Sequence, residues 1–206
     1  MNARIRFAVS LLVSISLLLP SPLLACGKER WPVKVATDKM QDRVDPTPVP
    51  ITIAKLRLID APINPNIRKN SRYAPTELTT YEVTATLTVV KSQKDEDYHL
   101  VIKDNKGRTM IVESPSPDCA EGSVFLDEIT SVRQAIDSEL GGPIHGKKKL
   151  KRLVTVTGVG FFDRIHDQEG VAPNGIELHP LLSIDFHPDK SIEDMRKRLS
   201  KPEEND

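Results

Sequence analysis

The stretch Leu153–Phe186, LVTVTGVGFFDRIHDQEGVAPNGIELHPLLSIDF, predicts two β-strands joined by a polar connection. Leu153–Phe161 alternates β-branched and small residues, and Ile176–Phe186 carries an apolar residue at nearly every second position. Side chains suited to chemistry lie where the first strand ends and the second begins: Asp163, His166, Glu177 and His179. Because loops held by a rigid scaffold often carry function, we expect the functional surface here.

Three further strands precede this pair. Tyr81–Val89 alternates apolar and polar residues with a period of two, which is typical of a half-buried strand. Tyr98–Lys103 and Arg108–Glu113 follow, and the connection Asp104–Gly107 has the Asn and Gly that favour a tight turn. The sequence therefore predicts a three-stranded meander.

A helix is predicted over Val124–Leu140. Its apolar residues recur at spacings of three and four, which places them on one face: Phe125, Ile129, Val132, Ile136 and Leu140. Ser123 is suited to cap the start of this helix, and Gly141 followed by Gly142 and Pro143 marks its end.

The order of three strands, one helix and two strands predicts a mainly β (α+β) fold. We expect a five-stranded OB-fold-like barrel over residues 81–187, with the helix between strands three and four. Residues 26–80 hold seven of the sixteen prolines, which predicts an irregular arm with one extended segment, Ile51–Ile59, laid on the domain. Residues 188–206 form a charged tail.

The basic run His145–Arg152 (HGKKKLKR) links the predicted helix to Leu153. It is either a solvated loop or a phosphate-binding patch. No aromatic residue or glycine cradle is interleaved with it, so the loop is favoured.

Residues 1–25 have the features of a secretory signal peptide. Arg4 and Arg6 precede the apolar run Phe7–Leu19, which is too short and wrongly flanked for a membrane-spanning helix. We therefore expect an exported protein, in the periplasm, secreted or attached to a membrane by a lipid.

Cys26 has three alternative fates in such a protein. Leu23–Cys26 resembles a bacterial lipobox, in which the cysteine is lipidated; Cys26 can instead pair with Cys119, or be lost when the signal is cleaved. Membrane attachment is expected only through lipidation of Cys26.

Charge argues against polyanionic partners. The chain has 29 basic and 29 acidic residues, and removal of Arg4 and Arg6 with the signal leaves 27 against 29. A strongly basic balance would favour nucleic acid or an anionic membrane surface, and this balance is absent.

Carboxylates and imidazoles gather in two parts of the predicted barrel. The meander contributes Asp97, His99 and Glu113, and the second strand pair contributes Asp163, His166, Glu177 and His179. Convergence of the two groups would suit a divalent metal, whose bound water is a hydrolytic nucleophile, and the candidate ligands are Asp163, His166 and His179. The alternative is that these side chains satisfy backbone donors in the turns, and no CxxC, HExxH or three-histidine motif favours the metal.

Four segments resemble an uncharacterised family of exported bacterial proteins that carries the motif GVAPNGIELHP. They are ERWPVKVATD at Glu29–Asp38, DYHLVIKD at Asp97–Asp104, TMIVESPSPDC at Thr109–Cys119, and TGVGFFDRIH with GVAPNGIELHP within Thr157–Pro180. The resemblance spans most of the chain after the signal and implies export, a single domain and no particular reaction. The order of elements is also similar to staphylococcal nuclease, but the acidic segment and paired arginines of that family have no counterpart here.

Three functions fit these observations. The first is a noncatalytic binding module of the bacterial envelope, the second a metal-dependent phosphodiesterase, and the third an interaction protein held by lipid or by its arm. Few aromatic residues remain outside predicted core positions for stacking nucleotide bases, so a protein or a glycan is the expected ligand. No cofactor is expected other than a divalent metal.

The first prediction concerns processing. Mass spectrometry of the protein recovered from its native host should find an N-terminus near Cys26. A lipid adduct on Cys26, an unmodified Cys26 or a start beyond it would distinguish the three fates. Recovery of the full-length chain beginning at Met1 would contradict export.

Overall fold

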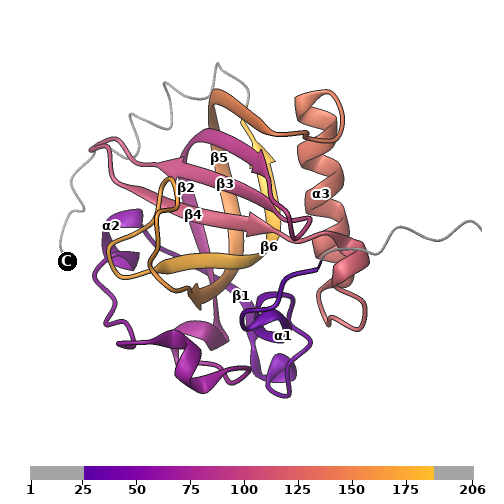
Figure 1. The fold of residues 1–206 in the computed structure, drawn as a ribbon. Coiled ribbons are helices and arrows are strands. Elements are labelled where there is room, and N and C mark those ends of the chain that lie inside the picture. The colour runs from indigo at the N-terminus through magenta and orange to yellow at the C-terminus, as the bar shows by residue number, and fades with distance from the viewer. Residues whose placement is uncertain (1–25, 188–206) are drawn as a thin grey trace, which may run out of the picture.

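The computed structural model describes residues 26–187, so the predicted signal peptide and charged tail lie outside the described residues. Within this range the chain is mostly β-sheet with one main helix (Figure 1). The strands are β1 (Asp45–Pro50), β2 (Thr79–Ser92), β3 (Tyr98–Lys103), β4 (Thr109–Ser114), β5 (Lys147–Phe162) and β6 (Ile176–Phe186). The helices are α1 (Trp31–Lys34), α2 (Ile53–Leu56) and α3 (Leu126–Leu140), with short 3-10 turns at Gln41–Arg43, Pro65–Arg68, Thr76–Leu78 and Pro117–Cys119.

Five of the strands form a hydrogen-bonded ring. β2 pairs with β3, β3 with β4, β6 with β5 and β5 with β2, all antiparallel, while β4 and β6 pair in parallel. β1 adds to β2 as a sixth, parallel strand. The mainly β class and the single main helix between the third and fourth strands of the ring are confirmed, but the sheet has six strands and not the five expected.

The additional strand β1 comes from the proline-rich region. Its sequence, DPTPVP, has three prolines in six residues, which argued against a strand. A proline that lacks a donor is tolerated on an edge strand, and β1 pairs on one side only, with β2. Edge position therefore explains why a strand forms where the composition predicted an irregular arm.

The prediction of an extended segment over Ile51–Ile59 is wrong. Residues Ile53–Leu56 form the short helix α2, in which the Thr52 hydroxyl accepts a hydrogen bond from the Lys55 amide at 3.2 Å. Ile53 and Leu56, three residues apart, share one face of this turn and are both buried. The local cap and the helical spacing of two core residues outweighed the β-branched composition.

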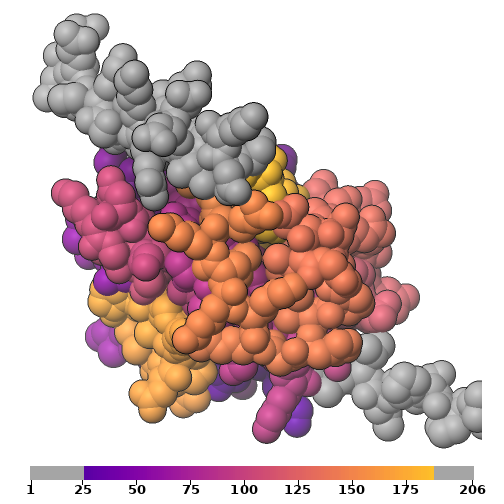
Figure 2. Space-filling model, turned by 90° about the horizontal axis from the view of Figure 1, so that it is seen from above, coloured from indigo at the N-terminus to yellow at the C-terminus, as the bar shows by residue number. Residues whose placement is uncertain are grey.

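The basic run is also different from the predicted loop. Lys147–Arg152 belongs to β5 and pairs with the end of β2, where Lys91 lies opposite Lys147. Figure 2 shows this part of the chain, in orange, spread over the molecular surface. The side chains are mostly exposed, because this half of β5 pairs with β2 alone, whereas β6 pairs with β5 only from Val154 onward.

The core divides into two clusters. The larger lies within the ring and includes Leu87, Leu100, Val112, Val156 and Leu178. The smaller lies between the N-terminal segment, the start of α3 and β5: Val35, Ala36, Val44, Ala120, Phe125, Ile129 and Val159. In Figure 1, α3 flanks the strands and α1 lies below them.

Helix α3 packs as its sequence predicts, with a different beginning. Ile129, Val132 and Ile136 are its buried residues, and Gly141 ends it in the left-handed conformation at φ 82°. Ser123 does not cap the helix, because the capping position is Phe125; the Ser123 hydroxyl accepts instead from the Phe125 amide at 3.1 Å. Among residues 26–187, no helix is both long and apolar enough to cross a membrane.

Substitution Ile136→Asp should unfold the domain. Ile136 is fully buried in the larger cluster, and an unpaired carboxylate there costs several kcal/mol, roughly the whole stability of a small domain. Circular dichroism and thermal melting would measure the loss. Ser138→Asp, at an exposed position of the same helix, should leave the melting curve nearly unchanged, and a cooperative native melt for I136D would contradict the packing.

Candidate functional site

A cluster of ionisable side chains lies on the face of β3, β4 and β6 that points away from the larger core. Leu100, Val112 and Leu178 point into that core, so the alternate residues on the same strands point outward. The pairing of His99 with Glu113, and of Val112 with Leu178, brings the outward residues of the three strands together. The residues so placed are Asp97, which immediately precedes β3, His99, Glu113, Glu177 and His179.

His179 occupies the centre of the cluster. Its Nδ1 donates to the Lys34 carbonyl oxygen at 2.9 Å, while Nε2 faces Asp97 Oδ2 at 3.2 Å and Glu113 Oε2 at 3.1 Å. The ring of Phe161 packs against the imidazole with centroids 5.7 Å apart. His179 therefore joins α1 to two strands.

Glu113 is held at both of its oxygens. Its Oε1 accepts from Gln93 at 2.9 Å and lies 3.0 Å from His99 Nδ1, whose Nε2 in turn meets the Glu169 carbonyl oxygen at 2.9 Å. Its Oε2 faces His179. The carboxylate is thus fixed in one orientation, with one oxygen aimed at the centre.

Lys34 covers the cluster from α1. Its Nζ lies 3.5 Å from Asp163 Oδ2 and 3.8 Å from Glu113 Oε2, and it also lies within the electrostatic reach of Asp97 and Glu177. None of the seven residues is more than 8% exposed. The site is therefore closed beneath α1.

The surroundings shift the pKa values of two central groups in opposite directions. Burial would lower the pKa of His179, but hydrogen bonds to Asp97 and Glu113 and the charge of Glu113 raise it to about 9. Burial would raise the pKa of Glu113, but His179, His99 and Lys34 hold it well below its usual range. At neutral pH, Glu113 is a carboxylate beside an imidazolium.

Glu177 behaves differently. Burial, and then repulsion from Glu113 and Asp163, raise its pKa well above the usual range. The pKa of Lys34 is raised, because the attraction of four carboxylates outweighs its burial. Neither Glu177 carboxylate oxygen has a hydrogen-bond partner within the described chain.

Buried ion pairs anchor the segment that covers the cluster. Arg30 donates to both carboxylate oxygens of Glu77, at 2.8 and 2.7 Å, and to the Phe162 carbonyl oxygen at 2.9 Å. Arg72 donates to Asp38 Oδ2 through Nε at 3.0 Å and Nη2 at 2.6 Å. These pairs fix both ends of the segment that carries Lys34.

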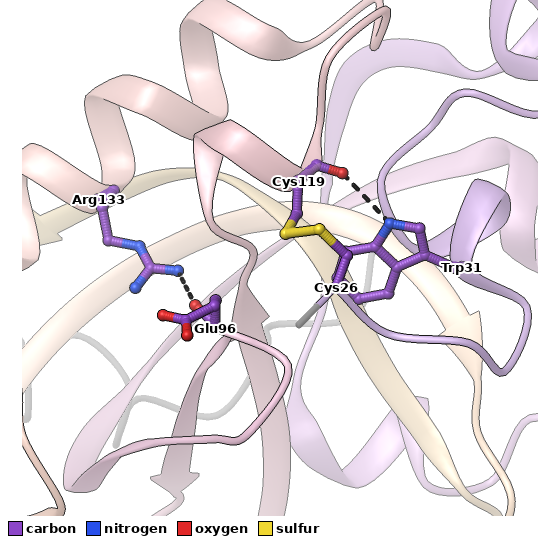
Figure 3. The surroundings of a disulfide bond; sticks show 5 residues. All are labelled: Cys26, Trp31, Glu96, Cys119 and Arg133. Atoms are coloured by element: carbon purple, nitrogen blue, oxygen red, sulfur yellow. Dashed lines mark hydrogen bonds between the residues drawn. A yellow bond between two sulfur atoms is a disulfide. The ribbon is translucent and has the colours of Figure 1, made fainter. Parts of the chain in front are cut away.

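A disulfide joins Cys26 to Cys119, across 93 residues of sequence (Figure 3). The Trp31 indole donates to the Cys119 carbonyl oxygen at 3.2 Å, so α1 is attached beside the bridge. Of the three alternatives for Cys26 the structure has the disulfide, and a sulfur so bonded cannot also carry a thioether-linked lipid. Disulfides persist in oxidising compartments, which agrees with export.

The structure brings together five of the six side chains expected to form a binding site. His99, Glu113, Asp163, Glu177 and His179 lie in the cluster or at its edge, next to Asp97. His166 does not join them, because it is exposed and its Nδ1 hydrogen-bonds the Arg164 carbonyl oxygen at 2.8 Å. The predicted metal ligands Asp163, His166 and His179 therefore do not converge on one point.

Sequence reasoning missed Lys34 and Gln93. Lys34 lies in a segment assigned to an irregular arm, although the segment Glu29–Asp38 that contains it is part of the family resemblance. Within residues 26–187, the group of side chains close enough to hold a metal ion is Asp97, Glu113 and His179, whose ligand atoms lie within 4.8 Å of one another.

A second feature lies on the surface beside this cluster. A hollow of about 370 Å³ is lined by Ala61–Pro65, by Phe162–Ile165, and by Pro173 and Asn174. Asp163 borders both features, with its side chain toward Lys34. Two of the lining residues, Ile63 and Ile165, are exposed isoleucines.

In comparisons with known proteins, the chain matches no protein-family model and no curated sequence.

Because folding raises the pKa of His179, we expect the free energy of unfolding to fall as the pH rises. The pKa of His179 is about 9 in the folded protein against about 6.5 unfolded, so its contribution is complete below pH 6.5 and lost through pH 9. Glu177, with its pKa raised, acts in the same direction. Urea unfolding in the presence of a chelator should show that the free energy of unfolding decreases by on the order of 3 kcal/mol between pH 6.5 and pH 9.

His179→Gln should flatten this dependence between pH 6.5 and 9, whereas His166→Gln, at an exposed position, should retain it. An equal slope in wild type and H179Q would contradict the protonation of His179.

Proposed function

We propose that the protein is a noncatalytic binding protein of the bacterial envelope, built on an OB-fold-like barrel, that binds an apolar segment of a protein partner. The strand ring supports the barrel, because its order along the sheet, β2-β3-β4-β6-β5 and back to β2, with α3 between β4 and β5, agrees with OB topology. The disulfide supports an extracytoplasmic location.

The observation that carries the binding proposal is the exposed apolar surface around the hollow. Six large hydrophobic residues of the described chain are exposed, and two of them, Ile63 and Ile165, line the hollow. Two more, Leu58 and Ile67, lie within three residues in sequence of the lining segment Ala61–Pro65. Gathered apolar side chains on a surface mark interaction sites, whereas single ones are ordinary. The hollow also borders the loop between β5 and β6, a loop that OB domains use for ligands.

The chemistry of this surface favours a protein segment over nucleic acid. No Phe, Tyr or Trp within residues 26–187 is fully exposed, and only Trp31, Tyr73 and Phe186 are half-buried, so few rings are available to stack on bases. Isoleucine and proline surround the hollow, and Arg164 and Asn64 supply polar contacts at its edge. A glycan is the alternative ligand.

A phosphodiesterase is less well supported. Catalytic metals keep an open coordination position for water or substrate. The carboxylates and histidines of the cluster are at most 6% exposed and lie beneath α1, so a phosphodiester has no access to them in this conformation. Burial of the cluster is the reason to prefer binding.

Selection from a displayed peptide library against the disulfide-bonded protein tests the proposal. Selected peptides should be rich in apolar residues, and Ile63→Asp with Ile165→Asp should weaken their binding at least tenfold, about 1.4 kcal/mol or more. Both positions are exposed, so thermal stability should change little.

Val124→Asp is the matched control, because Val124 is exposed to a similar degree as Ile165 and belongs to neither segment. Equal binding by the double variant and the control would place the ligand elsewhere. Binding to a glycan array, with no peptide selected, would contradict the choice of ligand.

A further inference from the structure

The arrangement of Asp97, Glu113 and His179 has the dimensions of a coordination sphere. His179 Nε2 lies 3.2 Å from Asp97 Oδ2 and 3.1 Å from Glu113 Oε2. Ligand atoms about 2.0–2.2 Å from one ion are separated by about 2.8–3.6 Å in octahedral or tetrahedral geometry. Both distances fall in this range, and the ligand atoms of all three residues lie within 4.8 Å of one another, so one ion can contact all three after a small adjustment of the carboxylates.

Two of the three ligands, His179 and Glu113, are already oriented for a metal by hydrogen bonds to residues outside the group. His179 Nδ1 donates to the Lys34 carbonyl oxygen, so a metal that replaces the proton on Nε2 finds a lone pair already directed between the two carboxylates. Gln93 and His99 hold Glu113 Oε1 and leave Oε2 for the centre. Metal-binding histidines and carboxylates are usually fixed by outer partners of this kind.

Unpartnered oxygens supply an independent observation. Both carboxylate oxygens of Glu177 and Oδ1 of Asp97 are buried without a hydrogen-bond partner, and both side chains are 0% exposed. Glu177 lies two residues before His179 on β6, which places it on the same face. Because buried polar atoms are nearly always paired, these oxygens indicate a missing partner.

Charge points to the same conclusion. Lys34 is the ammonium that faces the carboxylates of Asp97, Glu113, Asp163 and Glu177. With His179 neutral, as metal coordination through Nε2 requires, one ammonium faces four carboxylates, and such negative charge in a buried site is costly unless it is compensated. A divalent cation would compensate it at the point where the oxygens converge.

We propose that Asp97, Glu113 and His179 form a closed structural site for one divalent cation of the zinc type. Glu177, which is not part of the group of atoms within 4.8 Å, becomes the fourth ligand when its side chain turns toward the ion. One imidazole and three carboxylates suit Zn²⁺, Mn²⁺ or Co²⁺, whereas Ca²⁺ prefers six to eight oxygens. Because α1 covers the site, the ion enters during folding, before the N-terminal segment packs over β6. The site is separate from the hollow and independent of the ligand that binds there.

Refolding of the disulfide-intact protein with each ion tests this site. After removal of excess metal, elemental analysis should find one equivalent of Zn²⁺, Mn²⁺ or Co²⁺ and none of Ca²⁺. The melting temperature should rise by roughly 5–10 °C with the ion 100-fold above its Kd. X-ray absorption of the zinc form should give one imidazole and oxygen ligands at about 2.0–2.2 Å.

Glu177→Gln is the sharpest variant, because Glu177 has no hydrogen bond to lose. Glu177→Gln and Asp97→Asn should each weaken metal binding by about 100-fold or more, beyond what outer-partner changes cost, while His166→Gln should bind normally. No metal in the refolded wild type, or unchanged affinity in both cluster variants, would overturn the site. If Asp97→Asn does not fold, Glu177→Gln and the zinc absorption spectrum decide.

Discussion

The ion pair between Arg30 and Glu77 is the interaction on which the arrangement of the N-terminal half depends. Glu77 accepts from Arg30 and from the backbone amides of Tyr73 and Phe162, so one carboxylate joins three separate parts of the chain. Both side chains are almost fully buried. Loss of one member of such a pair leaves an uncompensated charge and costs about 3–5 kcal/mol, so these segments are held as a unit.

This anchor has a consequence for the charged face of the sheet. A face that carries Glu113, Glu177 and His179 would ordinarily lie in water, but here it lies beneath Lys34 and Phe161. Covering it is tolerable only because the polar groups of the cluster mostly pair with one another and with the covering segment. The disulfide at Cys26 attaches the same segment at its start, close to Trp31.

The sequence predicted the parts of the fold in which local pattern and tertiary environment agree. Alternation identified β2, β6 and the second half of β5, the turn with Asn and Gly identified the connection between β3 and β4, and helical spacing identified the buried face of α3. Local pattern failed where context decides: prolines in β1 are tolerated because that strand is at an edge, and Ile53 joins a helical turn because Thr52 caps it. In the site, the two-residue spacing of Glu177 and His179 is enough to place both side chains on one face of β6. No local signal in the sequence reveals that Lys34 crosses over them.

The stretch Leu153–Phe186 thus contributes to two surfaces, one of them buried and the other exposed to solvent. On β6, Glu177 and His179 are buried beneath α1, whereas Arg164 and Ile165, in the preceding loop, line the hollow. Asp163 links them, since its side chain meets Lys34 while its backbone amide binds the Gly175 carbonyl oxygen at 2.9 Å across the base of the loop. The buried charges therefore position the loop that borders the hollow, and a cation bound among them would stabilise that loop without touching its ligand.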